Sequence, residues 1–278
     1  ATYSFDNKYL LTATVRTDGS SVLAPGHQWV TYPAVSVGWN LDREKFFSNI
    51  KFVNALKLRA GWGISSNAGI NPYTTLGSLS SNFYNYGQGS TALVNYVNGY
   101  TINTLPNPEL TWEKTKGLNI GVDFALLNNR LTGSIEYFDS KTSDILLSKS
   151  LPVSNGANSI LVNAGKTSTK GMEFTISNLN VQSRKEGGFS WRTDLTAFFT
   201  REKIVALQQG LQQDVGNGWF VGKPITVIYD LKKLGIWQTS EATQAAVYGQ
   251  APGDIKLEDI NKNNSIDAND GQTGKSAV

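Results

Sequence analysis

Segments in which apolar and polar side chains alternate strictly recur along this chain. Between residues 9 and 17, one parity carries Tyr9, Leu11, Ala13 and Val15, while the other carries Thr12, Thr14 and Arg16. A strand points successive side chains to opposite faces, so a period of two predicts strands with one apolar and one polar face. The same alternation returns in segments that begin near Val35, Leu56, Leu118, Leu131, Met172 and Trp191. The pattern therefore predicts an all-β fold.

Two all-β architectures produce such strands. A soluble sandwich buries the apolar faces between two sheets, whereas a membrane barrel turns them to lipid. Trp and Tyr near strand ends favour an antiparallel transmembrane β-barrel, as do connections that alternate between tight and long. Asn128 and Asn129 predict a tight turn, and residues 65–108, rich in Asn, Gly, Tyr and Ser, predict a long extracellular loop. The alternative is a soluble or surface carbohydrate-binding β-sandwich, which would fold in buffer without detergent.

The composition of the chain excludes several other kinds of protein and of functional site. The 278 residues are 40% hydrophobic and 17% charged, and no apolar run reaches the length of a membrane helix, about 18 residues. The absence of cysteine excludes disulfides, thiolate metal sites and cysteine nucleophiles. The formal charge of +3 is small, and we expect the basic residues to be dispersed along strands and rims, without a patch. Nucleic acid is therefore not an expected partner.

Several sequence blocks resemble, in order and spacing, the barrel of the SusC/RagA family of TonB-dependent outer-membrane transporters. The blocks are YLLTATVRTDGSS (9–21), APG (24–26), YPAVSVGW (32–39), LKLRAGWG (56–63), NPELTWEKT (107–115), GVDF (121–124), LNNRLTGSIEYF (127–138), KGMEF (170–174) and GDIK (253–256). Together they cover most of the chain.

This resemblance implies a nutrient importer of the bacterial outer membrane, as found in Bacteroidota, in which a barrel of about 22 strands encloses an N-terminal plug. A SusD-like surface lipoprotein would deliver oligosaccharides or peptides, and TonB would supply energy. Residues 1–278 would be a partial barrel of about eight to ten strands in contact with outer-membrane lipid. The chain begins inside a strand and lacks a terminal aromatic strand, so we expect it to be a fragment, with the plug and the barrel ends outside it.

Aromatic residues of the long loop are the candidates for substrate contact. They are Tyr73, Phe83, Tyr84, Tyr86, Tyr96 and Tyr100. Flat aromatic faces among Asn and Gly suit sugar rings or peptides. The same residues could instead pack the loop against itself or against the lipoprotein.

A segment near the C-terminus, within the predicted loop 253–271, has the spacing of a calcium loop. Counting from Asp259, oxygen-bearing residues fall at the positions that an EF-hand loop uses. The candidate ligands are Asp259, Asn261, Asn263, Ser265, Asp267 and Asp270. The loop departs from the EF-hand pattern at two positions. Asn264 replaces the usual glycine at position six, which Asn tolerates because it enters the left-handed region, and Asp270 replaces the long bidentate glutamate at position twelve. We expect either weak, structural Ca²⁺ binding or a turn held by its own Asx hydrogen bonds.

The remaining candidates concern the barrel wall. Five tryptophans could form either a substrate-stacking platform or a membrane-interface girdle: Trp29, Trp39, Trp62, Trp112 and Trp191. The girdle is favoured because Trp39, Trp62 and Trp191 lie on the apolar parity of their strands. Charges of lumen parity predict a wet interior in which most charges pair across strands; they are Arg16, Lys57, Arg59, Asp123, Glu136, Glu173, Arg192 and Asp194. The single histidine, His27, lies in no catalytic motif, so we expect a transporter that requires no cofactor, and not an enzyme.

Overall fold

The computed structural model describes residues 1–85, 96–183, 185, 187–267 and 270–274. The chain forms two compact units, Ala1–Gly210 (unit 1) and Leu211–Val278 (unit 2). Each unit is described by itself below.

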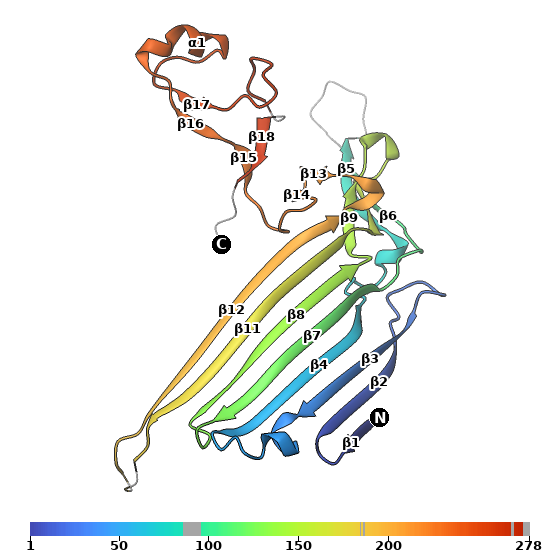
Figure 1. Cartoon of the computed structure of the whole chain (residues 1–278). Helices are drawn as coiled ribbons and strands as arrows, with labels where there is room; N and C mark the ends of the chain where they lie inside the picture. The colour runs from blue at the N-terminus through green and yellow to red at the C-terminus, as the bar shows by residue number, and fades with distance from the viewer. Residues whose placement is uncertain (86–95, 184, 186, 268–269, 275–278) are drawn as a thin grey trace. The chain divides into compact units, whose positions relative to one another are not determined.

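Unit 1 is dominated by one antiparallel sheet of eight strands, in which neighbours in sequence are mostly neighbours in space (Figure 1). The strand order is β1-β2-β3-β4-β7-β8-β11-β12. The strands are β1 (Thr2–Phe5), β2 (Tyr9–Gly19), β3 (Trp29–Asn40), β4 (Val53–Asn67), β7 (Glu113–Leu126), β8 (Leu131–Ser143), β11 (Lys166–Val181) and β12 (Trp191–Ala206).

The apolar parity of these strands forms one continuous face, which we call the outer face; the opposite parity forms the inner face. Register places Ile120 between Ala60 and Tyr137, so apolar side chains of adjacent strands line up in rows. The outer face is open: Ile120 is 48% exposed and Leu195 is 60% exposed. A sandwich would bury these residues, and within unit 1 no described element covers them. The predicted β-barrel wall is confirmed, and the sandwich alternative is rejected.

The connections differ at the two ends of the sheet. At one end the strands are joined by residues 6–8, 41–52, 127–130 and 182–190, which we call the short-turn rim. The predicted tight turn is confirmed here, since Leu127, Asn128 and Asn129 all have positive φ near 60°. At the other end the connections 68–112 and 144–165 are long, and we call this the long-loop rim. Outer-membrane barrels place short turns toward the periplasm and long loops outside the cell.

The long connections form a second, four-stranded sheet of order β5-β6-β10-β9. Its strands are β5 (Ser78–Asn85), β6 (Tyr96–Leu105), β9 (Leu146–Ser150) and β10 (Ser159–Asn163). Residues 65–108, predicted as one loop, therefore contain the end of β4 and a hairpin. Short 3-10 helices complete unit 1: η1 (Leu41–Arg43), η2 (Lys45–Phe47), η3 (Thr74–Leu76), η4 (Val153–Asn155) and η5 (Gln208–Gly210).

A small hydrophobic core ties the long-loop rim together. Leu23, Leu110 and Trp112 are buried against one another, and Trp112 Nε1 donates a hydrogen bond to the His27 carbonyl at 3.1 Å. The side chain of Asn163 donates to the Thr111 carbonyl at 2.8 Å, so the β10 end is fixed to the same core. Trp112 is thus a core residue and belongs neither to a girdle nor to a stacking platform.

Unit 2 is built from short elements, and its Trp237 is only 5% exposed and stacks on Tyr248. The elements are β13 (Gln213–Asp214), β14 (Trp219–Phe220), β15 (Tyr229–Leu231), β16 (Lys233–Ile236), η6 (Thr239–Glu241), α1 (Ala242–Val247), β17 (Ile255–Leu257) and β18 (Gly271–Thr273). Three two-stranded sheets result, β13-β14, β15-β18 and β16-β17. Among the described residues of the chain, every helix falls short of the length and apolar character needed to cross a membrane.

Candidate functional site

The inner face of unit 1 carries a charge network that spans three strands. Nε of Arg59 on β4 lies 3.2 Å from Oδ2 of Asp123 on β7, and Nη2 of Arg59 lies 2.6 Å from Oε2 of Glu136 on β8. Asn119 accepts a hydrogen bond from Arg59 at 3.3 Å and donates one to Glu136. All four side chains are partly exposed, so the network holds its shape while keeping access to water.

A glycine makes this network possible. Register places Gly121 directly between Arg59 and Glu136. A Cβ atom at position 121 would lie 2.8 Å from Cζ of Arg59, which is closer than van der Waals contact allows. The guanidinium therefore lies flat over the β7 backbone and reaches the carboxylate two strands away. The alternation pattern could not show this, because it depends on cross-strand register.

The other predicted inner-face charges follow two patterns. Arg192 and Asp194 pair at 3.0 Å, and Arg16 pairs with Asp18 at 3.1 Å. Both are pairs along one strand, so the predicted cross-strand pairing holds for the Arg59 network and is wrong for these. Glu173 is exposed and stands directly opposite Glu136 in the register of β8 and β11. The inner face is polar and charged, as expected of a surface in contact with water.

The inner face is slightly hollowed beside the network. A depression of about 360 Å³ lies over β2, β3, β4 and β7. Its polar lining includes Thr12, Ser36, Lys57, Arg59 and Asn119. Such a surface offers hydrogen-bond donors and acceptors to a passing solute or to protein that fills the lumen, and it does not enclose a small-molecule pocket.

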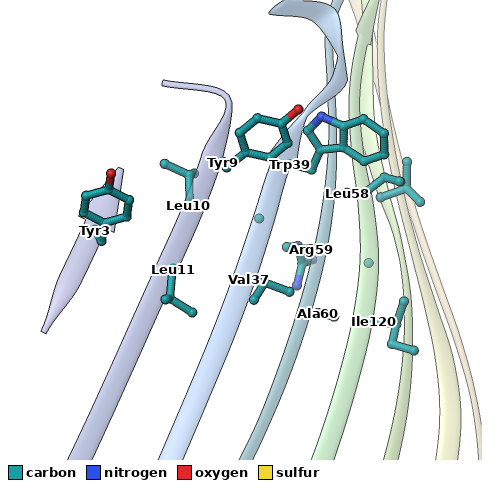
Figure 2. A pocket seen from close by; sticks show the side chains of 13 residues that line it. Tyr3, Tyr9, Leu10, Leu11, Val37, Trp39, Leu58, Arg59, Ala60 and Ile120 are labelled. Atoms are coloured by element: carbon teal, nitrogen blue, oxygen red, sulfur yellow. The ribbon is translucent and has the colours of Figure 1, made fainter. Parts of the chain in front are cut away.

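A larger hollow, about 710 Å³, lies on the outer face and is almost wholly apolar (Figure 2). Tyr9 and Trp39 lie at one end of this hollow, beside the short-turn rim, while Leu11, Val37 and Ile120 extend from it. An exposed apolar hollow on the outer face suits contact with lipid acyl chains better than contact with a polar solute.

Glu44, on the short-turn rim, fixes the polar tips of these aromatic residues. The Tyr9 hydroxyl donates to Glu44 Oε1 at 2.7 Å, and Trp39 Nε1 donates to the same oxygen at 3.1 Å. The Tyr9 hydrogen bond lowers the pKa of Glu44, and the Trp39 hydrogen bond lowers it further. An aromatic residue with an apolar body and an anchored polar tip suits the membrane interface, so Trp39 fits the predicted girdle.

The structure brings only some of the candidate aromatic residues together. Phe83 and Tyr100 share one face of the β5-β6 hairpin, and they are 72% and 70% exposed. Tyr84 lies on the opposite face, with its ring against Gly99, and Tyr73 lies apart as the left-handed residue before η3. Tyr86 lies outside the described residues, and for Tyr96 only the backbone is described. Leu79 and Ile102, which the sequence analysis did not single out, share the face of Phe83.

The predicted calcium loop has the backbone of such a loop, but its oxygens accept internal hydrogen bonds. Asp259 accepts the N–H of Asn264 at 2.9 Å, and Asn264 has a φ of 63°, as expected at position six. Asn261 and Asn263 each accept the N–H two residues on, which is the expected Asx-turn geometry. Residues 268 and 269 are not described; among the described residues, no three His, Asp or Glu side chains converge as a metal site. Calcium binding stays a prediction.

Asp270 is the anchor of this loop. It is fully buried and accepts the N–H of Asp267 at 2.9 Å and that of Ile260 at 2.9 Å. Hydrogen bonding, first from the Asp267 N–H, lowers the pKa of Asp270. Calcium prefers carboxylate and carbonyl oxygens. If the prediction is right, the ion would be held by Asp259, Asn261, Asn263, Ser265 (through its backbone carbonyl), Asp267 and Asp270.

The sequence of this chain is similar to those of known TonB-dependent receptors. The family described as "TonB dependent receptor-like, beta-barrel" matches residues 1–253. TonB-dependent receptor P26 of Formosa agariphila is 33% identical over 96% of this chain. TonB-dependent receptor SusC of Bacteroides thetaiotaomicron is 31% identical over 96% of this chain. In both cases the chain spans 27% of the relative's length.

A solved structure supports the fold. The structure titled "RagAB peptide transporter" superposes with a TM-score of 0.76 and 22% identity, covering 98% of this chain and 28% of that chain. The superposition shows that the eight-stranded sheet and the long-loop rim share the architecture of that barrel.

Proposed function

The chain belongs to the TonB dependent receptor-like β-barrel family of the bacterial outer membrane, and we propose that it forms part of the wall of a TonB-energised nutrient importer. The observation that carries this proposal is the pair of opposite faces on one sheet. The outer face is apolar and exposed, as a lipid contact must be, while the inner face carries the Arg59 network and the polar depression. A wall with these faces separates lipid from a wet path.

The proposed substrates are oligosaccharides or peptides delivered by a SusD-like surface lipoprotein. Support comes from the relatives, one of which is named SusC, and from the solved neighbour titled a peptide transporter. Within this chain, the exposed face of the β5-β6 hairpin suits contact either with a large solute or with the lipoprotein, which would act as a lid. Phe83 and Tyr100 supply rings, and Leu79 and Ile102 extend the apolar surface.

TonB would act through a part of the receptor outside these residues. The inner-face network offers a fixed polar surface against which a plug could move, because Arg59 is held by two carboxylates of the barrel itself. No catalytic step is part of the proposal. His27 lies 3.6 Å from Glu109, and its carbonyl binds Trp112, so its contacts are those of a loop residue.

Uptake by cells tests the import proposal. The full-length gene is deleted, and uptake of labelled oligosaccharides and of labelled oligopeptides is compared with and without a proton ionophore. We expect energy-dependent uptake of one class to disappear and to return with the wild-type gene. Unchanged uptake of both classes in the deletion strain would contradict the proposal.

Substitutions on the hairpin distinguish solute contact from lid contact. We expect Phe83→Ala with Tyr100→Ala to weaken uptake about thirtyfold, because each exposed ring contributes about 1 kcal/mol when it is buried in an interface. Tyr84→Phe, on the opposite face, is the matched control. Loss of lipoprotein co-purification would assign these rings to the lid, whereas loss of solute affinity in the intact complex would assign them to the substrate.

A further inference from the structure

The outer face carries a cluster of cations at the long-loop rim. The strands β7, β8, β11 and β12 are adjacent in the sheet (Figure 1). Their register gives seven basic residues outer-face parity. We call them the outer cation cluster: Lys114, Lys116, Lys141, Lys166, Lys170, Arg201 and Lys203, all of them exposed. They are dispersed in sequence, but register gathers them, so the expectation that the basic residues form no patch is wrong.

The register sets like charges against one another. Lys116 stands directly opposite Lys141, and Lys170 stands directly opposite Arg201. Lys141 and Lys203 flank the small Ser168 from its two sides. Like charges in direct cross-strand pairs destabilise a sheet.

The protein supplies little negative charge to offset this repulsion. Asp139 lies on the same face and pairs with Lys170 at 3.1 Å. Glu113 and Glu202, on the same strands, have inner-face parity and point to the other side of the sheet. Within the described part of the chain, no other carboxylate forms an ion pair with the cluster. Among the described residues, Asp139 is thus the single carboxylate that offsets the seven cations of the cluster.

The cluster also has a defined depth. Along β7 the outer face is apolar from Leu126 to Leu118 and then carries Lys116 and Lys114. That apolar stretch is about 27 Å long at about 3.4 Å per residue, and strand tilt reduces its height to about 20 Å. Barrels of this kind present an apolar band about 25 Å tall to lipid. The first lysines therefore stand at the level of the head groups, on the rim that faces outside the cell.

We propose that the outer cation cluster is a binding site for a phosphate-bearing lipid of the outer leaflet. The acyl chains would lie on the apolar rows below, and the phosphate would lie between Lys116, Lys141 and Lys203, whose repulsion it relieves. Charge complementarity and depth both support a lipid, because the same strands supply the apolar surface and the cations. This inference rests on the membrane location of the barrel and is independent of what the receptor imports.

Lipid retention by the full-length receptor tests the inference. The receptor is placed in phosphatidylcholine nanodiscs that contain either lipid A, a phosphorylated glycolipid, or the same glycolipid with its phosphates removed, and retained glycolipid is counted by native mass spectrometry. We expect retention of the phosphorylated form only, weakening as salt is raised. The triple substitution Lys116→Gln, Lys141→Gln and Lys203→Gln should reduce retention about a hundredfold, since each cation near an anionic surface contributes roughly fivefold.

The matched control removes three exposed lysines from the short-turn rim: Lys45→Gln, Lys51→Gln and Lys185→Gln. It should retain lipid A as the wild type does. Heat-modifiable migration on gels verifies that both variants fold. Equal retention by the two variants, or equal retention of both glycolipids by the wild type, would overturn the proposal. So would unchanged lipid retention with loss of a co-purifying protein, which would assign the cluster to an acidic protein surface.

Discussion

The two faces of the eight-stranded sheet balance their charges differently. On the inner face, Arg59 finds Asp123 and Glu136 within the barrel. On the outer face, Lys116 and Lys141 stand side by side without a carboxylate. The inner charges meet water and can be neutralised by neighbours, whereas the outer charges lie at the lipid boundary, where an anion of the membrane can serve. The same strands thus present charges in two environments. Inner-face charges are paired with neighbouring side chains, whereas outer-face charges lie at the depth of the lipid head groups.

The largest expected effect comes from a lysine placed at mid-depth on one face or the other. Ile135→Lys puts a charge into the outer apolar band, where it should destabilise the barrel by about 2–4 kcal/mol. Ser134→Lys, one residue away on the same strand, points to the inner face and should change stability little. Urea unfolding of the full-length receptor in liposomes measures both. If the two variants lose similar amounts of unfolding free energy, the two faces do not differ in their surroundings as described.

A smaller effect is expected from filling the space under Arg59. In Gly121→Ala, the new Cβ would lie 2.8 Å from Arg59 Cζ, so the guanidinium must move and its bond to Glu136 is lost. Loss of a charged hydrogen bond of this kind costs about 1–3 kcal/mol. The control is Gly117→Ala on the same strand and face, where the nearest atom is Ser140 Oγ at 3.8 Å. If both alanines have the same effect in the unfolding assay, intrinsic strand preference explains them and the network does not.

Acid should weaken the short-turn rim of the outer face. The Tyr9 hydroxyl lowers the pKa of Glu44, so this carboxylate stabilises the fold fully above its unfolded pKa of about 4.5. The stabilisation is lost as pH falls through the lower pKa of the folded state. We expect the melting temperature of the receptor to fall in this window, and to fall less in Tyr9→Phe. A pH profile that Tyr9→Phe leaves unchanged would argue against the Glu44 anchor.

The smallest expected effect is that of calcium on unit 2, which belongs to neither face. If loop 259–270 binds with a dissociation constant of about 10⁻⁴–10⁻³ M, calcium at that concentration stabilises the loop by about 0.4 kcal/mol. Calorimetric titration of the full-length receptor should show one weak site that Asp259→Asn abolishes, while Asp254→Asn, outside the loop, serves as the control. Absence of binding heat in the wild type would leave the loop as a turn held by Asx bonds.

The face on which each side chain lies could be predicted from the sequence, but its contacts on neighbouring strands could not. A period of two assigns Leu118 and Asn119 to opposite faces without any knowledge of the fold. The Arg59 network required the register of three strands and the absence of a side chain at Gly121. The outer cation cluster required four strands, from residues 114 to 203. The core around Trp112 was missed because it joins loops, where side chains follow no period.

Spin-label accessibility along β8 tests the central claim most directly. The chain has no cysteine, so single substitutions at Leu131, Thr132, Ser134 and Ile135 place one label at a time. In the full-length receptor in liposomes, labels at Leu131 and Ile135 should collide with dissolved oxygen, and labels at Thr132 and Ser134 with a water-soluble nickel chelate. Accessibility that does not alternate along the strand, or that alternates in the opposite sense, would contradict the account.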